Sequence, residues 1–154
     1  MTQTGMSYRK SAIEGASPIG LAIALFDTLV GDLRRAASAL RINDIEARCR
    51  ELNHAALVLG QLESWVDVKN GGEPALQLCR FYAYLRSKMM EASVKKSAAI
   101  LETQIEMILH VRSSWQQRDM ASQQEVAKAA EVTPEAEPKP STPLLERVAM
   151  SFSA

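Results

Sequence analysis

The side chains of this sequence best suited to chemistry are two histidines, each close to a carboxylate. Glu51 and His54 have the Glu-x-x-His spacing, which places both groups on one face of a helix. Helical bundles that hold two iron or manganese ions use this pair twice, together with two further glutamates. The other nearby pair, Glu106 and His110, has the wrong interval for a second half-site. The sequence therefore predicts no metal or other cofactor, and a di-metal carboxylate enzyme centred on Glu51 and His54 is kept as an alternative.

The other reactive side chains match no catalytic pattern. Cys49 and Cys79 lie far apart and form no Cys-x-x-Cys motif, so neither a redox pair nor a zinc site is indicated. The Gly71-Gly72 pair follows a predicted helix and not a strand, which excludes a phosphate-binding loop. There is also no nucleophile elbow. We therefore predict no catalytic residues and a protein that is not an enzyme.

Composition narrows the possible partners. The chain has 154 residues with 18 basic and 18 acidic side chains, and this zero net charge argues against nucleic-acid binding. Its longest uncharged stretch, from Gly15 to Phe26, is shorter than the roughly 18–20 residues that a membrane span needs. The first ten residues have no apolar core of the kind found in secretory signals. We expect a cytoplasmic protein with no membrane insertion.

Between Pro18 and Arg118, apolar residues recur three and four positions apart, and no segment alternates in the manner of a strand. Four long helices joined by short loops pack as an antiparallel up-down-up-down bundle. The sequence thus predicts an all-α protein with a four-helix bundle. The start of each helix is marked by a capping residue or a proline, in the order Ser17-Pro18, Asn43-Asp44, Pro74 and Ser97.

The bundle is predicted to occupy residues 17–118, after an N-terminal arm at 1–16. Residues 119–154 differ in composition, since 121–143 are rich in Ala, Glu, Gln, Ser and Pro and have few large apolar side chains. Such a segment buries too little apolar surface to offset its ordering entropy, so we predict a mostly disordered tail. A helical spacing returns at its end and predicts a short amphipathic segment, formed by Leu144, Leu145, Val148 and Phe152.

Several apolar side chains fall outside the inward-facing stripes of the predicted helices. If these side chains remain exposed, they form a groove suited to an amphipathic segment of a partner protein. The residues concerned are Leu21, Leu25, Leu57, Val58, Phe81, Tyr84 and Met90.

Short motifs in a fixed order resemble the flagellin-specific export chaperones of the FliS family. Tyr8 precedes an Ala-Ser-Pro helix start, and a Leu-Phe-Asp run follows at residues 25–27. The Tyr-Ala-Tyr-Leu segment at residues 82–85 resembles the family's Tyr-Asp-Tyr-Met, and residues 112–115 match its closing Arg-x-x-Trp. The resemblance covers about residues 5–118. Ala83 replaces the family's usual acidic residue, which suggests a divergent member.

The resemblance implies a non-enzymatic, cytoplasmic chaperone. Such proteins bind the disordered C-terminal segment of flagellin, prevent its premature polymerisation and hold it for the flagellar export apparatus, a second implied partner. The segment from Tyr8 to Ile13 is implied to act as a displaceable lid over the binding surface, the alternative being an arm that completes the core. A helical adaptor for another secretion client is a further alternative. The residues expected to contact the client are Tyr8, Ile13, Leu57, Phe81, Tyr82 and Tyr84.

Overall fold

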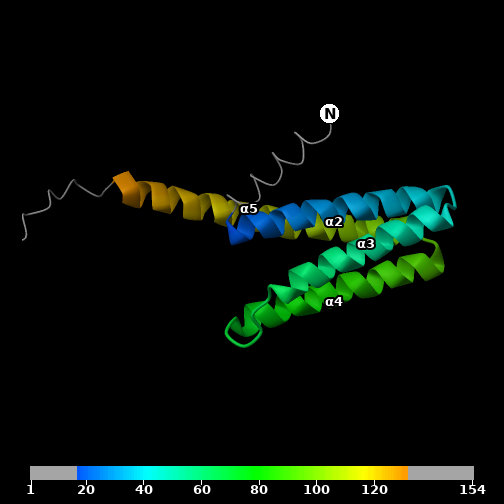
Figure 1. Ribbon diagram of the computed structural model, residues 1–154, viewed down its shortest axis with the longest axis horizontal. Helices are drawn as coiled ribbons and strands as arrows, with labels where there is room; N and C mark the ends of the chain where they lie inside the picture. The colour runs from blue at the N-terminus through cyan, green and yellow to red at the C-terminus, as the bar shows by residue number, and fades with distance from the viewer. Residues whose placement is uncertain (1–16, 132–154) are drawn as a thin grey trace, which may run out of the picture. The chain divides into compact units, whose positions relative to one another are not determined.

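The computed structural model describes residues 17–131, and the regular structure in this range is entirely helical. The predicted all-α class is therefore confirmed. Within the same range, no helix is long and apolar enough to cross a membrane. The predicted arm and the amphipathic segment near the C-terminus lie outside the described residues. The four helices are α2 (Pro18–Arg41), α3 (Ile45–Ser64), α4 (Gly72–Lys95) and α5 (Ala98–Glu131) (Figure 1).

The first two helices begin at the predicted caps. Ser17 Oγ accepts a hydrogen bond from the backbone N–H of Gly20 at 3.0 Å, and Pro18 occupies the first turn of α2. The carboxylate of Asp44 accepts a hydrogen bond from the backbone N–H of Ala47 at 2.9 Å. Each cap satisfies an N–H group that has no acceptor within the helix, so a local sequence signal determines where the helix starts.

The loop between α3 and α4 is organised by Asp67. Its carboxylate accepts hydrogen bonds from the side-chain amide and backbone N–H of Asn70 and from the backbone N–H of Lys69. The hydrogen bonds from Asn70 lower the pKa of Asp67 below its ordinary value. Helix α4 then begins at Gly72, earlier than the predicted start at Pro74. The φ angle of Gly72 is 61°, a left-handed conformation that glycine adopts without a Cβ clash.

Helix α5 is longer than the sequence analysis predicts. It continues to Glu131, so the prediction that helical structure ends near Arg118 is wrong for residues 119–131. Alanine, glutamine, glutamate and lysine dominate this segment, and all four residues favour helices even where no core is available. The chain divides into two compact units after Asp119, and every described residue of the second unit is exposed. The proposed domain boundaries themselves stay a prediction.

Neighbouring helices of the first unit run antiparallel, as the short loops predict. Figure 1 shows α2 beside α5 and α3 beside α4. Glu63 of α3 accepts hydrogen bonds from Arg86 of α4 at 3.0 Å. Three polar contacts join α2 to α5 in opposite order along the two helices: Ser17 with Asp119, Asp27 with Arg112, and Arg41 with Glu102.

The core lies along the shared axis of these helices and is made of their inward stripes. Val58 belongs to the core, although the sequence analysis placed it outside the stripe of its helix. It is buried because α3 packs closely on α2, and this contact covers a wider face of α3 than one stripe. The largest fully buried apolar side chains are Tyr82, Phe26, Leu29, Leu33, Leu59, Leu62, Leu85, Leu101 and Ile108.

Candidate functional site

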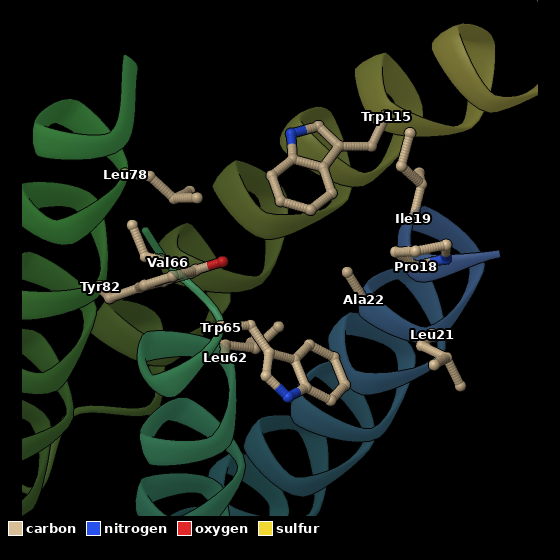
Figure 2. Close-up of a pocket in the computed structure, with 10 residues that line it drawn as sticks. All are labelled: Pro18, Ile19, Leu21, Ala22, Leu62, Trp65, Val66, Leu78, Tyr82 and Trp115. Carbon is tan, nitrogen blue, oxygen red and sulfur yellow. The ribbon is translucent and has the colours of Figure 1, made fainter. Parts of the chain in front are cut away.

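An apolar cavity of about 600 Å³ lies at the end of the bundle where α2 begins and α3 ends (Figure 2). Its walls come from all four helices and from the loop after α3. No lining side chain carries a charge, and the polar atoms of these side chains belong to one tyrosine and two tryptophans. The lining residues are Pro18, Ile19, Leu21 and Ala22 from α2, Leu62, Trp65 and Val66 from α3 and its loop, and Leu78, Tyr82 and Trp115 from α4 and α5.

The rim of the cavity is formed by the end of α3. The helix stops at Ser64, and the backbone N–H of Trp65 donates to the carbonyl of Leu62 at 3.2 Å. Trp65 and Val66 therefore extend from a turn and not from a regular helix face. The indole of Trp65 is 48% exposed and forms one side of the opening. A large, half-exposed aromatic side chain at the edge of an apolar cavity is typical of a surface that buries part of another molecule.

The floor of the cavity rests on a cluster of aromatic rings. Phe26 is completely buried, and its ring lies 5.2 Å from that of Trp115 in an edge-to-face arrangement. The Tyr82 ring lies 6.4 Å from Phe26 on the other side. Aromatic pairs at these separations stabilise one another beyond the burial of their area. Phe26 therefore supports the two aromatic residues that line the cavity, Tyr82 and Trp115.

Two of the sequence motifs meet beside this aromatic cluster, at a contact between α2 and α5. Arg112 donates two hydrogen bonds to the carboxylate of Asp27, from Nε at 2.5 Å and from Nη2 at 3.1 Å. The hydrogen bond to Asp27 raises the pKa of Arg112 above its ordinary value. Because Phe26 also contacts Trp115, the Leu-Phe-Asp run and the Arg-x-x-Trp motif form one contact between α2 and α5. Their role in the described structure is to join α2 to α5, two of the four helices that line the cavity.

Tyr82 combines burial with an exposed polar atom inside the cavity. The residue as a whole is 1% exposed to solvent. Figure 2 shows its hydroxyl pointing into the space between the side chains of Trp65 and Trp115. Burial raises the pKa of this phenol well above its ordinary value, so the hydroxyl keeps its proton at every physiological pH. It can both donate and accept a hydrogen bond.

The structure brings one of the predicted contact residues to the cavity. Tyr82 lines it, and Leu21, which the sequence analysis placed outside the inward stripe, also lies in its wall. Tyr8 and Ile13 fall outside the described residues. Their predicted role stays a prediction.

The other three predicted contact residues lie away from the cavity. Leu57 is 73% exposed on α3, and Tyr84 is 42% exposed on α4, where the ammonium group of Lys88 lies 5.7 Å from its ring. Phe81 is half-buried, with its ring 6.0 Å from that of Tyr82. None of the three lines the cavity, and their role in client contact also stays a prediction.

Sequence reasoning missed the rim of the cavity. The apolar period predicts that Val66, Leu78 and Trp115 belong to core stripes, and it gives no role to Trp65. One signal was available, because both tryptophans of the chain lie in the cavity wall. The sequence predicts that the second helix continues to residues 69–72, whereas α3 ends at Ser64, directly before Trp65. Tryptophan is enriched among the residues that dominate the binding energy of interfaces.

The candidate metal-ligating residues are engaged with other side chains. Glu51 accepts a hydrogen bond from Arg35 Nε at 2.8 Å, and Nδ1 of His54 lies 2.7 Å from the Asp32 carboxylate. Among residues 17–131 no three His, Cys, Asp or Glu side chains are grouped so that they could hold a metal ion. Glu106 and His110 are both exposed on α5. The described residues therefore offer no set of ligands for a di-metal centre.

Fold and cavity together define this chain as a helical bundle with an apolar cavity, a geometry suited to holding apolar side chains of a partner. The sequence model of the family described as "Flagellar protein FliS" matches residues 1–124. The chain therefore belongs to the FliS family.

Three curated relatives support this assignment. The chain is 28% identical to the flagellar secretion chaperone FliS of Salmonella typhimurium over 109 residues, which cover 70% of this chain and 81% of the relative. It is 27% identical to the flagellar secretion chaperone FliSB of Pseudomonas aeruginosa over 112 residues, covering 70% and 89%. It is 24% identical to the flagellar secretion chaperone FliS of Vibrio cholerae over 115 residues, covering 72% and 85%. The chain is accordingly a flagellar secretion chaperone and not an enzyme, which confirms both the resemblance and the predicted class.

Proposed function

We propose that this chaperone acts in the cytoplasm, binds the C-terminal segment of flagellin, prevents its premature polymerisation and holds it for the flagellar export apparatus. The observation that carries the proposal is the apolar cavity between the start of α2 and the end of α3. Family membership indicates a flagellar client. The uncharged lining indicates that the client offers apolar side chains.

The cavity suits an amphipathic segment. Apolar side chains that recur three and four positions apart enter an apolar groove together when the segment becomes helical. Each Å² of apolar surface removed from water contributes about 25 cal/mol, whereas ordering a disordered segment costs about 2–5 kcal/mol or more. The two terms oppose each other. A large buried surface therefore yields a moderate affinity, which suits a protein that must release its client at the export apparatus.

Binding one apolar stripe also explains how polymerisation would be prevented. Amphipathic segments associate with one another through the same faces that they would bury in a cavity. A segment held between the rim at Trp65 and the wall of α2 cannot offer that face to a second flagellin chain. We expect Trp65 to provide a large share of the binding energy, since tryptophans at the edge of a desolvated pocket often do.

The N-terminal arm is proposed to regulate access. Pro18 and Ile19 are cavity-lining residues, and the arm joins the bundle at Ser17, directly before them. A lid at Tyr8 to Ile13 would compete with the client, so deletion of residues 1–14 should leave the fold intact and tighten client binding. Loss of folding would support the alternative, an arm that completes the core. Intact folding with unchanged affinity would exclude the lid.

The proposed function is tested by co-purification. The full-length chaperone is immobilised and exposed to full-length flagellin and to flagellin without its C-terminal segment. We expect retention of the first and loss of the second. Equal retention of both forms would overturn the assignment to the C-terminal segment. Failure to retain either form would favour an adaptor for another secretion client.

A further inference from the structure

The hydroxyl of Tyr82 forms no hydrogen bond with the described residues, and it is not fully buried, because it borders the cavity. Among the described residues, the fully buried side-chain polar atoms without a hydrogen-bond partner are Nε of Arg48 and Oε1 of Gln104, whereas the Tyr82 hydroxyl can meet water or a ligand in the cavity. The aromatic ring has an evident structural role, because it packs between Phe26 and Phe81. The hydroxyl has none, since a phenylalanine would make both ring contacts equally well.

The direction of this hydroxyl relates it to the cavity. Figure 2 shows it directed away from its own helix, into the space bordered by Trp65 and Trp115. Every other side chain of the wall is either aliphatic or an indole. An indole nitrogen can only donate a hydrogen bond, so the phenol is the one side-chain group of this wall that can also accept one.

We infer that Tyr82 is a specificity-determining residue, whose hydroxyl forms a hydrogen bond with an uncharged polar side chain of the bound client segment. The inference rests on the proposed function and deepens it, because it states the chemistry of the segment. Within an apolar face, the segment carries one serine, threonine, asparagine or glutamine that meets this hydroxyl.

The absence of charge in the wall excludes an ionised partner for the hydroxyl. None of the lining side chains could compensate a carboxylate or an ammonium group. Burial of an uncompensated charge costs far more than one hydrogen bond returns. Because burial keeps Tyr82 protonated, the phenol remains neutral and suits a neutral group. A hydroxyl or a carboxamide meets these conditions.

The test is the substitution Tyr82→Phe, which removes one oxygen atom and keeps the ring contacts. Calorimetric titration with a peptide of the flagellin C-terminal segment should show about tenfold weaker binding. The free variant should unfold at the same denaturant concentration as the original chain, because the removed hydroxyl forms no hydrogen bond with the described residues. If the hydroxyl had a purely structural role, its removal would instead lower the free energy of unfolding. As a matched control, Ser87→Ala removes a hydroxyl from an exposed position of the same helix and should leave affinity unchanged.

A double-mutant cycle identifies the partner group. Each serine, threonine, asparagine and glutamine of the peptide is replaced in turn by alanine. One replacement should weaken binding to the original chain and have little further effect on Tyr82→Phe. The inference is overturned if Tyr82→Phe binds as tightly as the original chain, or if every replacement acts independently of it. If the original chain does not bind the peptide at all, it is the proposed function that fails.

Discussion

The two ends of the helical bundle are built differently. At one end, where α2 begins, large aromatic side chains meet and an apolar cavity opens beside them. At the other end the fully buried core combines the small side chains of Ala36 and Ala92 with the leucine Leu101. Small residues let helix axes approach closely, whereas large ones keep them apart. The bundle is therefore closed at one end and open at the other.

Polar contacts also differ between the two ends of the bundle. Next to the alanines, the completely buried Asp32 accepts a hydrogen bond from Arg35 at 2.6 Å and lies 2.7 Å from Nδ1 of His54. This network joins α2 to α3. The wall of the cavity contains no charged residue, and its Tyr82 hydroxyl has no partner among the described residues. The comparison indicates that the closed end stabilises the fold, while the open end is available for a client.

The largest expected effect is a loss of stability when the aromatic cluster below the cavity is disrupted. Phe26→Ala removes a completely buried ring that contacts Trp115 and Tyr82. A large-to-small change of this kind lowers the free energy of unfolding by about 3–5 kcal/mol. Urea denaturation measures the loss. A change below about 1 kcal/mol would show that the floor does not hold the open end in place.

The second prediction separates binding from stability at the rim. Trp65→Ala should weaken binding of the flagellin segment by about 30-fold, because an aromatic anchor at a cavity rim is lost. The free energy of unfolding should change little, since the indole is already half-exposed. Val68→Ala provides the control, as this exposed apolar side chain of the same loop does not line the cavity. Equal losses of affinity for the two variants would contradict the division.

The third prediction concerns the closed end. Asp32→Ala removes the acceptor for Arg35 and the partner of His54, both of which are more than half-exposed and remain hydrated. We therefore expect a loss of only about 1–2 kcal/mol in the free energy of unfolding. Asp32→Asn, which keeps one acceptor oxygen, should lose less. The affinity for the client, measured under conditions where the variant is fully folded, should be unchanged. A clear fall in this affinity would show that the two ends are coupled.

The smallest effect is expected on the surface of α4. Hydrogen bonds from Lys88 and Lys95 lower the pKa of Glu91 to about 2. A lowered carboxylate pKa stabilises the fold above the ordinary value of 4.5, and this contribution disappears as the pH falls towards about 2. Glu91→Gln should be slightly less stable at neutral pH, and the two proteins should converge near pH 2. Thermal unfolding measures the difference in stability between the two proteins. If this difference stayed constant from neutral pH to pH 2, the ion pairs of Glu91 could not be its cause.

The helices were predictable because their signals are local. Ser17 and Asp44 cap α2 and α3 where the sequence places them, and the apolar period identifies the core faces. The end of α5 was not predictable in the same way. Alanine, glutamate and glutamine favour a helix and are equally common in disordered segments, so composition alone supported two answers for residues 119–131.

The cavity was predictable only in part. Tyr82 was identified through a motif, but its burial and the direction of its hydroxyl depend on three neighbouring helices. Trp65 was missed because an apolar stripe predicts which side of a helix faces the core. It does not predict how far away the next helix lies. That distance depends on side-chain volumes summed over all four helices. Leu57 illustrates the converse, since an apolar residue off the stripe is simply exposed.

The central claim is that the cavity holds the client, and filling the cavity tests it most directly. Ala22 lines the wall, whereas Ala24 is exposed on the same helix and does not. Calorimetric titration with the flagellin segment compares Ala22→Phe and Ala24→Phe, after circular dichroism has shown that both variants are folded. We predict at least about 30-fold weaker binding for Ala22→Phe and unchanged binding for Ala24→Phe. Unchanged binding of the segment to folded Ala22→Phe would contradict the account.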